Sequence, residues 1–175
     1  SPAALGMAFD DWFKHLSHNP TEQAELARKL VEALGRMPGL VLQAGRAPGT
    51  PGIEPGLPDR RFIHPGWQTW PFNVMSQSYL LTEAWWRDAT TGIHGVSPHH
   101  ENVVSFTVRQ LLDMASPANF PWANPEVLER TVQTGGANLV HGAQHLAEDW
   151  RRAAMGAHAP DQRTYQVGVN VAVTP

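Results

Sequence analysis

Two histidine pairs are the residues of this sequence whose spacing could hold a metal ion. His141 and His145 lie four residues apart, so on a helix their imidazoles would share one face. A zinc protease carries a glutamate between two such histidines, but residues 142–144 read Gly-Ala-Gln, and a third ligand is not evident. We therefore predict surface or capping roles for this pair and no metal.

The second pair, His99 and His100, is followed by Glu101 at the expected start of a helix. Consecutive helical residues point in different directions, so the three side chains do not converge on one ion. We predict a structural role for them near the helix cap.

Cysteine chemistry is excluded more firmly, because the chain contains no cysteine. Disulfides, thiolate metal sites and a cysteine nucleophile are therefore impossible within it. The glycine-containing motifs of serine hydrolases, dinucleotide-binding folds and P-loop proteins do not occur either. We expect no catalytic residue, no cofactor and no metal in these 175 residues.

The composition, 42% hydrophobic and 17% charged, is typical of a globular protein with one core. A formal net charge of −3 argues against a nucleic-acid partner, which would favour a basic face. No apolar run is long enough for a transmembrane segment, and no signal-peptide pattern is visible, so we expect a cytoplasmic protein. Because Ser1 stands where an initiator methionine would, we also expect processing or excision from a longer chain.

Helical periodicity dominates the elements that must position these residues. We predict a mainly α fold of about five to six helices with a single C-terminal β-strand. The predicted divisions are an N-terminal helical arm (1–44), a Pro/Gly-rich linker (45–58), a helical domain (59–164) and the strand (165–175).

The arm is expected to contain a short helix over residues 9–16, with Trp12 and Phe13 buried. A longer helix begins after the Asn19 cap, carries one apolar stripe and ends at Pro38-Gly39. That stripe consists of Ala27, Leu30, Val31 and Leu34.

In the helical domain, a helix over residues 71–89 is followed by two helices with caps at Ser97 and Asn124. The helix after Ser97 has a predicted core stripe, which consists of Val104, Val108, Leu111, Leu112 and Ala115. The pair Gly135-Gly136 is expected to separate the last two helices. The final helix is predicted to face inward through Leu139, Ala143, Leu146, Ala147 and Trp150.

Seven aromatic residues lie between Phe62 and Trp86. Such a cluster is either hydrophobic core or a face that binds an apolar polymer or partner, and we favour core, with some tryptophans shared with an interface. The interface candidates are Trp67, Trp70, Trp85, Trp86 and Trp122.

Residues 165–174 alternate valine and tyrosine with small or polar residues, a period of two that predicts a strand. No second strand is evident upstream, and a lone strand leaves its backbone groups unpaired. We therefore expect its partner in another chain or in a C-terminal continuation.

Several separated motifs resemble the N-terminal domain of polyhydroxyalkanoate synthases, the poly-(R)-3-hydroxybutyrate polymerases. The resemblance covers about residues 59–175 and begins with "DRRFIHPGW". Its further motifs are Asn119-Phe120-Pro121, Asn124-Pro125-Glu126, Gly135-Gly136, Glu148-Asp149 and the terminal segment Asn170 to Pro175.

The resemblance implies that this helical domain precedes an α/β-hydrolase-like catalytic domain, into which the predicted strand leads. The Cys-Asp-His triad would lie beyond residue 175, in an acyltransferase that polymerises (R)-3-hydroxyacyl groups from coenzyme A. The partners it implies are that catalytic domain, a second copy in a homodimer, and the storage granule or its coat proteins. It places the protein in the cytoplasm, at the granule surface.

Two other interpretations remain open on the residues alone. A free-standing helical adaptor would bind a partner through its aromatic face and C-terminal strand. A histidine-metal hydrolase would need ligands that the sequence does not supply.

Overall fold

The computed structural model describes residues 1–46 and 59–155, without the side chains of residues 43–46. Its elements are α1 (Pro2–Ser17), α2 (Pro20–Arg46), η1 (Arg60–Phe62), η2 (Pro65–Gln68), α3 (Phe72–Thr90), α4 (Pro98–Met114), η3 (Pro117–Asn119), α5 (Pro125–Gln133) and α6 (Ala137–Ala154). The prediction of a mainly helical chain with five to six helices is confirmed. The predicted strand at 165–175 and most of the predicted linker lie outside the described residues, which themselves contain no strand.

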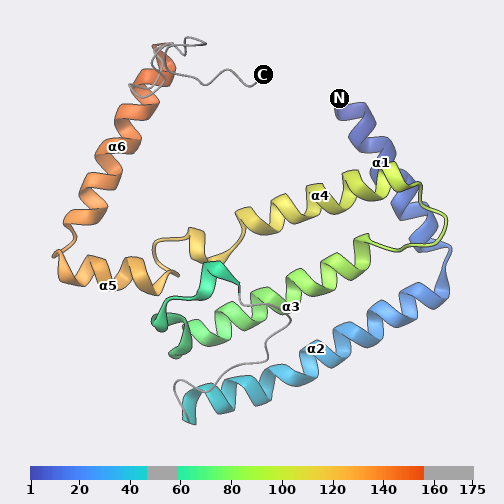
Figure 1. The fold of residues 1–175 in the computed structure, drawn as a ribbon, viewed down its shortest axis with the longest axis horizontal. Helices are drawn as coiled ribbons and strands as arrows, with labels where there is room; N and C mark the ends of the chain where they lie inside the picture. Colours follow the sequence, from blue (N-terminus) through green and yellow to red (C-terminus); the bar gives the residue numbers. More distant parts are fainter. Residues whose placement is uncertain (47–58, 156–175) are drawn as a thin grey trace, which may run out of the picture. The chain divides into compact units, whose positions relative to one another are not determined.

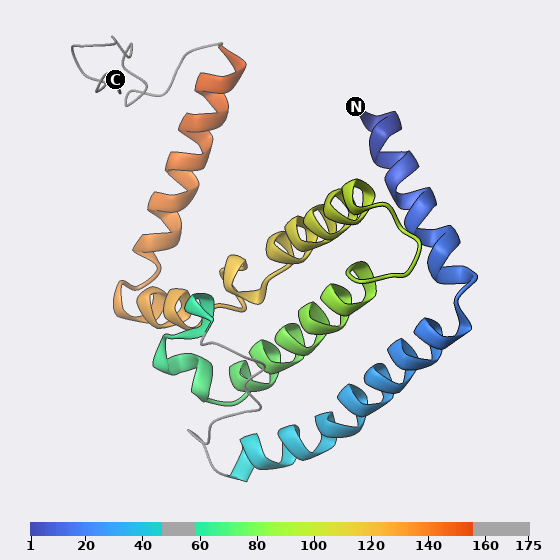
Figure 2. The ribbon, with the colours of Figure 1, turned by 45° about the vertical axis from the view of Figure 1, so that its right-hand side comes forward.

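The chain divides into two compact units, Ser1–Leu128 and Glu129–Pro175. In the first unit α3 lies between α2 and α4, and the three helices run side by side (Figures 1 and 2). Helix α1 packs against α4 and α2. Residues 1–44 thus pack against α3 and α4, while the predicted domain boundary at the linker stays a prediction.

Three helices begin directly after residues whose side chains cap them. The side chain of Asn19 accepts a hydrogen bond from the Glu22 amide at 3.2 Å, and that of Ser97 accepts one from the His100 amide at 3.3 Å. Asn124 caps α5 in the same way. Each cap is followed by proline, whose fixed φ suits the first helical position. The three predicted helix starts are confirmed.

The predicted end of the second helix is wrong, because α2 continues through Pro38 to Arg46. A proline removes one backbone hydrogen bond from a helix, and packing along the helix offsets that loss. Here Leu26 and Leu40, on either side of the proline, are both buried. The Ser78 hydroxyl also contacts Met37 Sδ at 3.9 Å, which ties this part of α2 to α3.

The predicted apolar stripe of α2 is likewise not the buried face. Leu30, Val31 and Leu34 are 42%, 68% and 60% exposed, because α2 is turned so that Leu26 and Leu40 face inward. In the first helix, α1 is longer than predicted and Phe13 is 63% exposed, while Trp12 is half-buried. The Trp12 indole donates to the Ala89 carbonyl at 2.8 Å, which fixes the side of α1 that packs.

Two clusters of buried side chains hold the first unit together. Ala8, Val104 and Val108 form one between α1 and α4, joined by Trp12 and Trp86. The other consists of Phe62, Trp67 and Tyr79, with Phe72 and Leu80 packed against it. The predicted core stripe of α4 is therefore correct at Val104 and Val108, whereas Leu111 is 58% exposed.

The second unit shows the predicted break at the glycine pair. Gly135 and Gly136 have φ of 59° and 89°, so α5 ends before them and α6 begins after them. The inward face predicted for α6 is wrong, since Leu139, Leu146 and Trp150 are 46%, 66% and 74% exposed. Within the described part of this unit, no second helix lies along α6.

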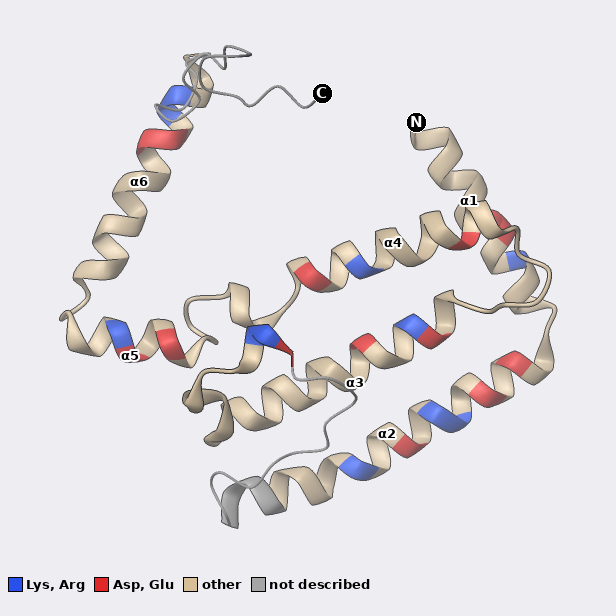
Figure 3. Cartoon of the chain, in the orientation of Figure 1, with Lys and Arg blue, Asp and Glu red and all other residues tan. Residues whose placement is uncertain are grey.

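Charged residues are spread over the helices. Acidic and basic residues are interleaved along α2 and α3 (Figure 3). Among the described helices, none has an apolar stretch sufficient to cross a bilayer.

Candidate functional site

The polar centre of the first unit is the Arg61 cluster, which consists of Asp59, Arg61, Tyr79, Glu83 and Asp113. Asp59 caps the short helix η1, because its Oδ1 accepts a hydrogen bond from the Arg61 backbone amide at 2.9 Å. This local turn aims the Arg61 guanidinium at α3 and α4, where it meets residues 18 to 52 positions away.

The Arg61 guanidinium donates hydrogen bonds to side chains of both α3 and α4. Its Nη1 donates to Tyr79 Oη and to Asp113 Oδ1, both at 2.7 Å, and its Nη2 donates to Glu83 Oε2 at 2.9 Å. The Tyr79 hydroxyl donates a hydrogen bond to the Leu112 carbonyl at 3.0 Å. The cluster therefore fastens η1, α3 and α4 to one another.

Electrostatics in the cluster follow from three carboxylates around one guanidinium. Hydrogen bonding to Arg61 lowers the pKa of Asp59 below its ordinary value, and the carboxylates raise the pKa of Arg61. Burial raises the pKa of Tyr79, which stays a neutral donor. All three carboxylates pair with the one guanidinium of Arg61.

From this cluster a groove runs between α3 and α4 with a volume of about 1250 Å³. We call it the α3–α4 groove. Its apolar lining consists of Phe62, Ile63, Leu80, Val103, Phe106, Val108 and Leu112. Ile63 and Phe106 are 72% and 65% exposed, so the groove presents apolar surface that a ligand or partner could bury.

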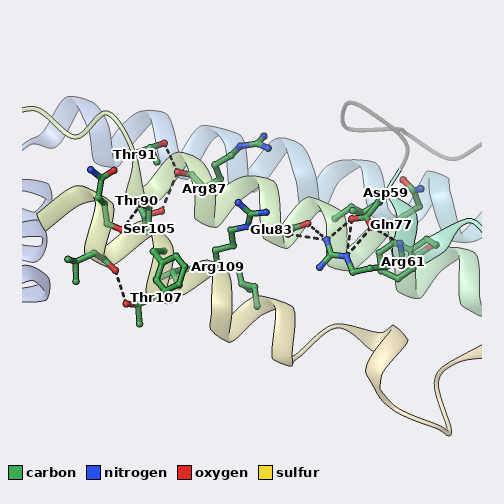
Figure 4. Close-up of a pocket in the computed structure, with 18 of the residues that line it drawn as sticks. Asp59, Arg61, Gln77, Glu83, Arg87, Thr90, Thr91, Ser105, Thr107 and Arg109 are labelled. Carbon is green, nitrogen blue, oxygen red and sulfur yellow. Dashed lines mark hydrogen bonds and ion pairs between the residues drawn. The ribbon is translucent and has the colours of Figure 1, made fainter. Parts of the chain in front are cut away.

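Two arginines occupy the middle of the groove. Arg87 stands on α3, and Arg109 extends from α4 toward α3 beside it (Figure 4). Neither guanidinium forms a hydrogen bond or ion pair with any side chain of the described residues, although Glu83 lies one turn from Arg87. The Glu83 carboxylate is bound to Arg61 instead.

One further polar atom in the groove lacks a partner. Gln77 Oε1 is buried and accepts no hydrogen bond within the described part of the chain. A buried carbonyl oxygen without a donor costs free energy, and because this atom is inaccessible to solvent it is not a contact point for an occupant of the groove.

The five tryptophans predicted as interface residues occupy different environments. Trp67 is 2% exposed and packs edge-on against Phe62 at 4.8 Å between ring centroids. Trp85 and Trp86 are half-buried, and the Trp85 indole donates to the Leu26 carbonyl of α2. Trp70 and Trp122 are 61% and 73% exposed. An interface role for these residues stays a prediction, and only the last two offer large free surfaces.

The histidines lie as follows. His100 Nδ1 is 2.7 Å from Asp11 Oδ2, which links α4 to α1, and His99 is exposed at the end of the groove. His141 and His145 are exposed on α6. Among the described residues, no three His, Asp or Glu side chains gather closely enough to hold a metal ion.

Sequence reasoning missed the Arg61 cluster and both groove arginines. The only local signal was Asp59 two residues before Arg61, a spacing at which the aspartate can cap a turn. The partners Glu83 and Asp113 are 22 and 52 residues away, and no periodicity connects them.

Comparison with known proteins now places these features. Residues 58–175 match the model of the poly-beta-hydroxybutyrate polymerase (PhaC) N-terminus. The chain belongs to this family. The Arg61 cluster and the α3–α4 groove both lie within the part that matches, whereas α1 and α2 precede it.

Individual relatives agree with the family match. The chain is 32% identical to a poly(3-hydroxyalkanoate) polymerase of Methylorubrum extorquens, over 95% of this chain and 27% of the relative. It is 35% identical to the PhaC subunit of the polymerase from Rhizobium meliloti (strain 1021), over 67% of this chain and 20% of the relative. The chain thus spans about a quarter or less of these relatives. No solved structure matches it significantly.

Proposed function

We propose that this N-terminal polymerase domain supports the polymerisation of (R)-3-hydroxyacyl-CoA into storage polyester by binding and stabilising the catalytic part of the enzyme. The observation that carries this proposal is the match of residues 58–175 to the polymerase N-terminus. The chain has no cysteine, so the thiol nucleophile that the family resemblance implies must come from elsewhere. The contribution of the domain is then non-covalent.

The surface of the first unit suits such a binding role. Its apolar groove is open, and Trp70 and Trp122 expose large aromatic surfaces, which are enriched where proteins meet. Self-association into a homodimer and docking on the granule or its coat proteins are further roles that we propose for the exposed tryptophans, Trp70 and Trp122. They would place the protein in the cytoplasm, at the granule surface.

The proposal is tested with the Methylorubrum extorquens polymerase, the relative aligned over 95% of this chain. That enzyme is expressed without its aligned region, and coenzyme A release from (R)-3-hydroxybutyryl-CoA is measured with and without this chain added. We expect this chain to release no coenzyme A alone, and to raise the activity of the truncated enzyme at least about tenfold. Coenzyme A release by the chain alone, or an unchanged truncated enzyme, would contradict the proposal.

A further inference from the structure

We propose that the α3–α4 groove binds an acidic amphipathic helix, and that this helix belongs to the catalytic part of the polymerase. The inference rests on the proposed function for the source of the helix. The chemistry of the occupant comes from the groove itself.

The dimensions of the groove favour a helix over a small molecule. Its lining extends over the sixteen residues from Ser76 in α3 to Thr91 just after that helix, and follows α4 from His99 to Leu112. At about 1.5 Å per residue, the groove is roughly 20 Å long. Sites for small molecules are more compact and enclose most of their ligand. A long open trough between two antiparallel helices is the usual receptor for a third helix.

The apolar lining sets the first requirement on the occupant. Leu80, Val103 and Phe106 lie along the trough, so the helix must present apolar residues at three- and four-residue steps. Phe106 would be covered by such a helix, which explains why a phenylalanine 65% exposed is positioned over the groove.

The two arginines set the second requirement, which is negative charge. Arg87 on α3 and Arg109 on α4 both line the trough (Figure 4), and neither guanidinium forms an ion pair with a carboxylate of the described residues, although Glu83 and Asp113 stand one turn away. Both guanidinium groups are exposed and solvated in the free chain, so a helix that covers them must replace the lost water with an anion. A glutamate or aspartate on the occupant can accept hydrogen bonds from both guanidinium groups.

The same charges argue against a second copy of this groove as the occupant. Pairing two grooves about a two-fold axis would bring four arginines together. The incoming helix should therefore carry its carboxylate toward Arg87 and Arg109.

The test measures binding of this chain to the truncated Methylorubrum extorquens polymerase by fluorescence anisotropy. Reversing both charges, in Arg87→Glu/Arg109→Glu, should weaken binding at least about tenfold, because two charge-assisted contacts become repulsions. The matched control is Arg36→Glu on the exposed face of α2, which should change Kd less than twofold. Both groove arginines are exposed and unpaired, so the variants should melt at the wild-type temperature.

The outcomes separate the inference from the proposed function. Binding that is unaffected by the double reversal overturns the groove assignment and leaves the proposed function standing. Absence of binding by the unaltered chain overturns both.

A second measurement identifies the occupant directly. A photo-crosslinking phenylalanine analogue at position 106 should attach to one segment of the catalytic part that contains Asp or Glu in an amphipathic pattern. Changing that acid to lysine should restore binding to the Arg87→Glu/Arg109→Glu variant. Crosslinking to a segment without an acidic residue overturns the inference. Saturable binding of laurate to the chain alone also overturns it if the Arg87→Glu/Arg109→Glu variant no longer binds laurate, because the groove would then be a fatty-acid site.

Discussion

Two neighbouring parts of α3 differ in how their charged groups are paired. In the middle of the helix, Tyr79 and Glu83 belong to a cluster in which the donors of Arg61 are shared among three carboxylates and a phenol. One turn later, Arg87 lines the α3–α4 groove together with Arg109, and neither has an acidic partner in the described residues. The first arrangement is complete within the chain, and the second is not.

This difference indicates which charged groups of α3 and α4 stabilise the fold and which are available to bind a partner. Groups that satisfy one another contribute to folding, and removing one leaves the others exposed to repulsion or desolvation. Groups left unsatisfied contribute little to folding and remain available to a partner. We therefore expect substitutions near the Arg61 cluster to lower stability, and substitutions in the groove to lower binding with little effect on stability.

The largest effect should come from the aromatic core beside the Arg61 cluster. Trp67→Ala should lower the free energy of unfolding by about 3–5 kcal/mol, because Trp67 is 2% exposed and packed against other rings. Phe106→Ala, in the groove, should change it by less than about 0.5 kcal/mol. Urea denaturation of both variants gives the comparison. Similar losses for the two would show that the groove is packed core and not a free surface.

The next effect concerns the arginines themselves. Arg61→Met should cost about 2 kcal/mol, a value below that of a fully buried pair because the Arg61 side chain is 28% exposed. High salt should recover part of this loss, since it screens the three carboxylates left without a cation. Arg109→Met is the matched control and should leave the urea midpoint nearly unchanged. Equal midpoints for both variants would remove the distinction between the paired and unpaired arginines.

The glycines of the second unit extend the comparison to backbone conformation. Gly136→Ala should cost about 1 kcal/mol, because φ of 89° is strained for any residue with a Cβ, even though the space around it is open. Gly142→Ala, inside α6 with equally open surroundings, should instead stabilise by about 0.5–1 kcal/mol. Thermal unfolding followed by circular dichroism measures both. If both alanines stabilise, α5 and α6 form one continuous helix.

The smallest effect concerns a second paired carboxylate, Asp11, and its dependence on pH. Hydrogen bonds from His100 and from the Ser97 amide lower the pKa of Asp11 below its ordinary 3.8. A carboxylate with a lowered pKa stabilises the fold above that pH, and the contribution is lost as the pH falls below about 4. Asp11→Asn should therefore flatten the loss of stability between about pH 5 and 3. The neighbouring Asp10→Asn is the control and should keep the wild-type slope.

Features that depend on neighbouring residues could be predicted from the sequence. Asn19, Ser97 and Asn124 cap their helices as predicted, and the pair at Gly135 breaks the last two. Features that packing decides could not. Pro38 is a strong helix-stop signal, yet α2 passes through it, with Leu26 and Leu40 buried on either side of the proline.

By itself, then, the sequence determined the mainly helical class, the helix starts and the family to which the chain belongs, because caps, glycine conformations and motifs are properties of a few adjacent residues. Only the tertiary structure decided which face of α2 is buried and which tryptophan is core. It alone joined Arg61 to Asp113 across 52 positions and left Arg87 and Arg109 without a partner in the described residues. These outcomes depend on how helices distant in the chain are turned toward one another, and that orientation is set by the sum of many weak contacts that no local pattern contains.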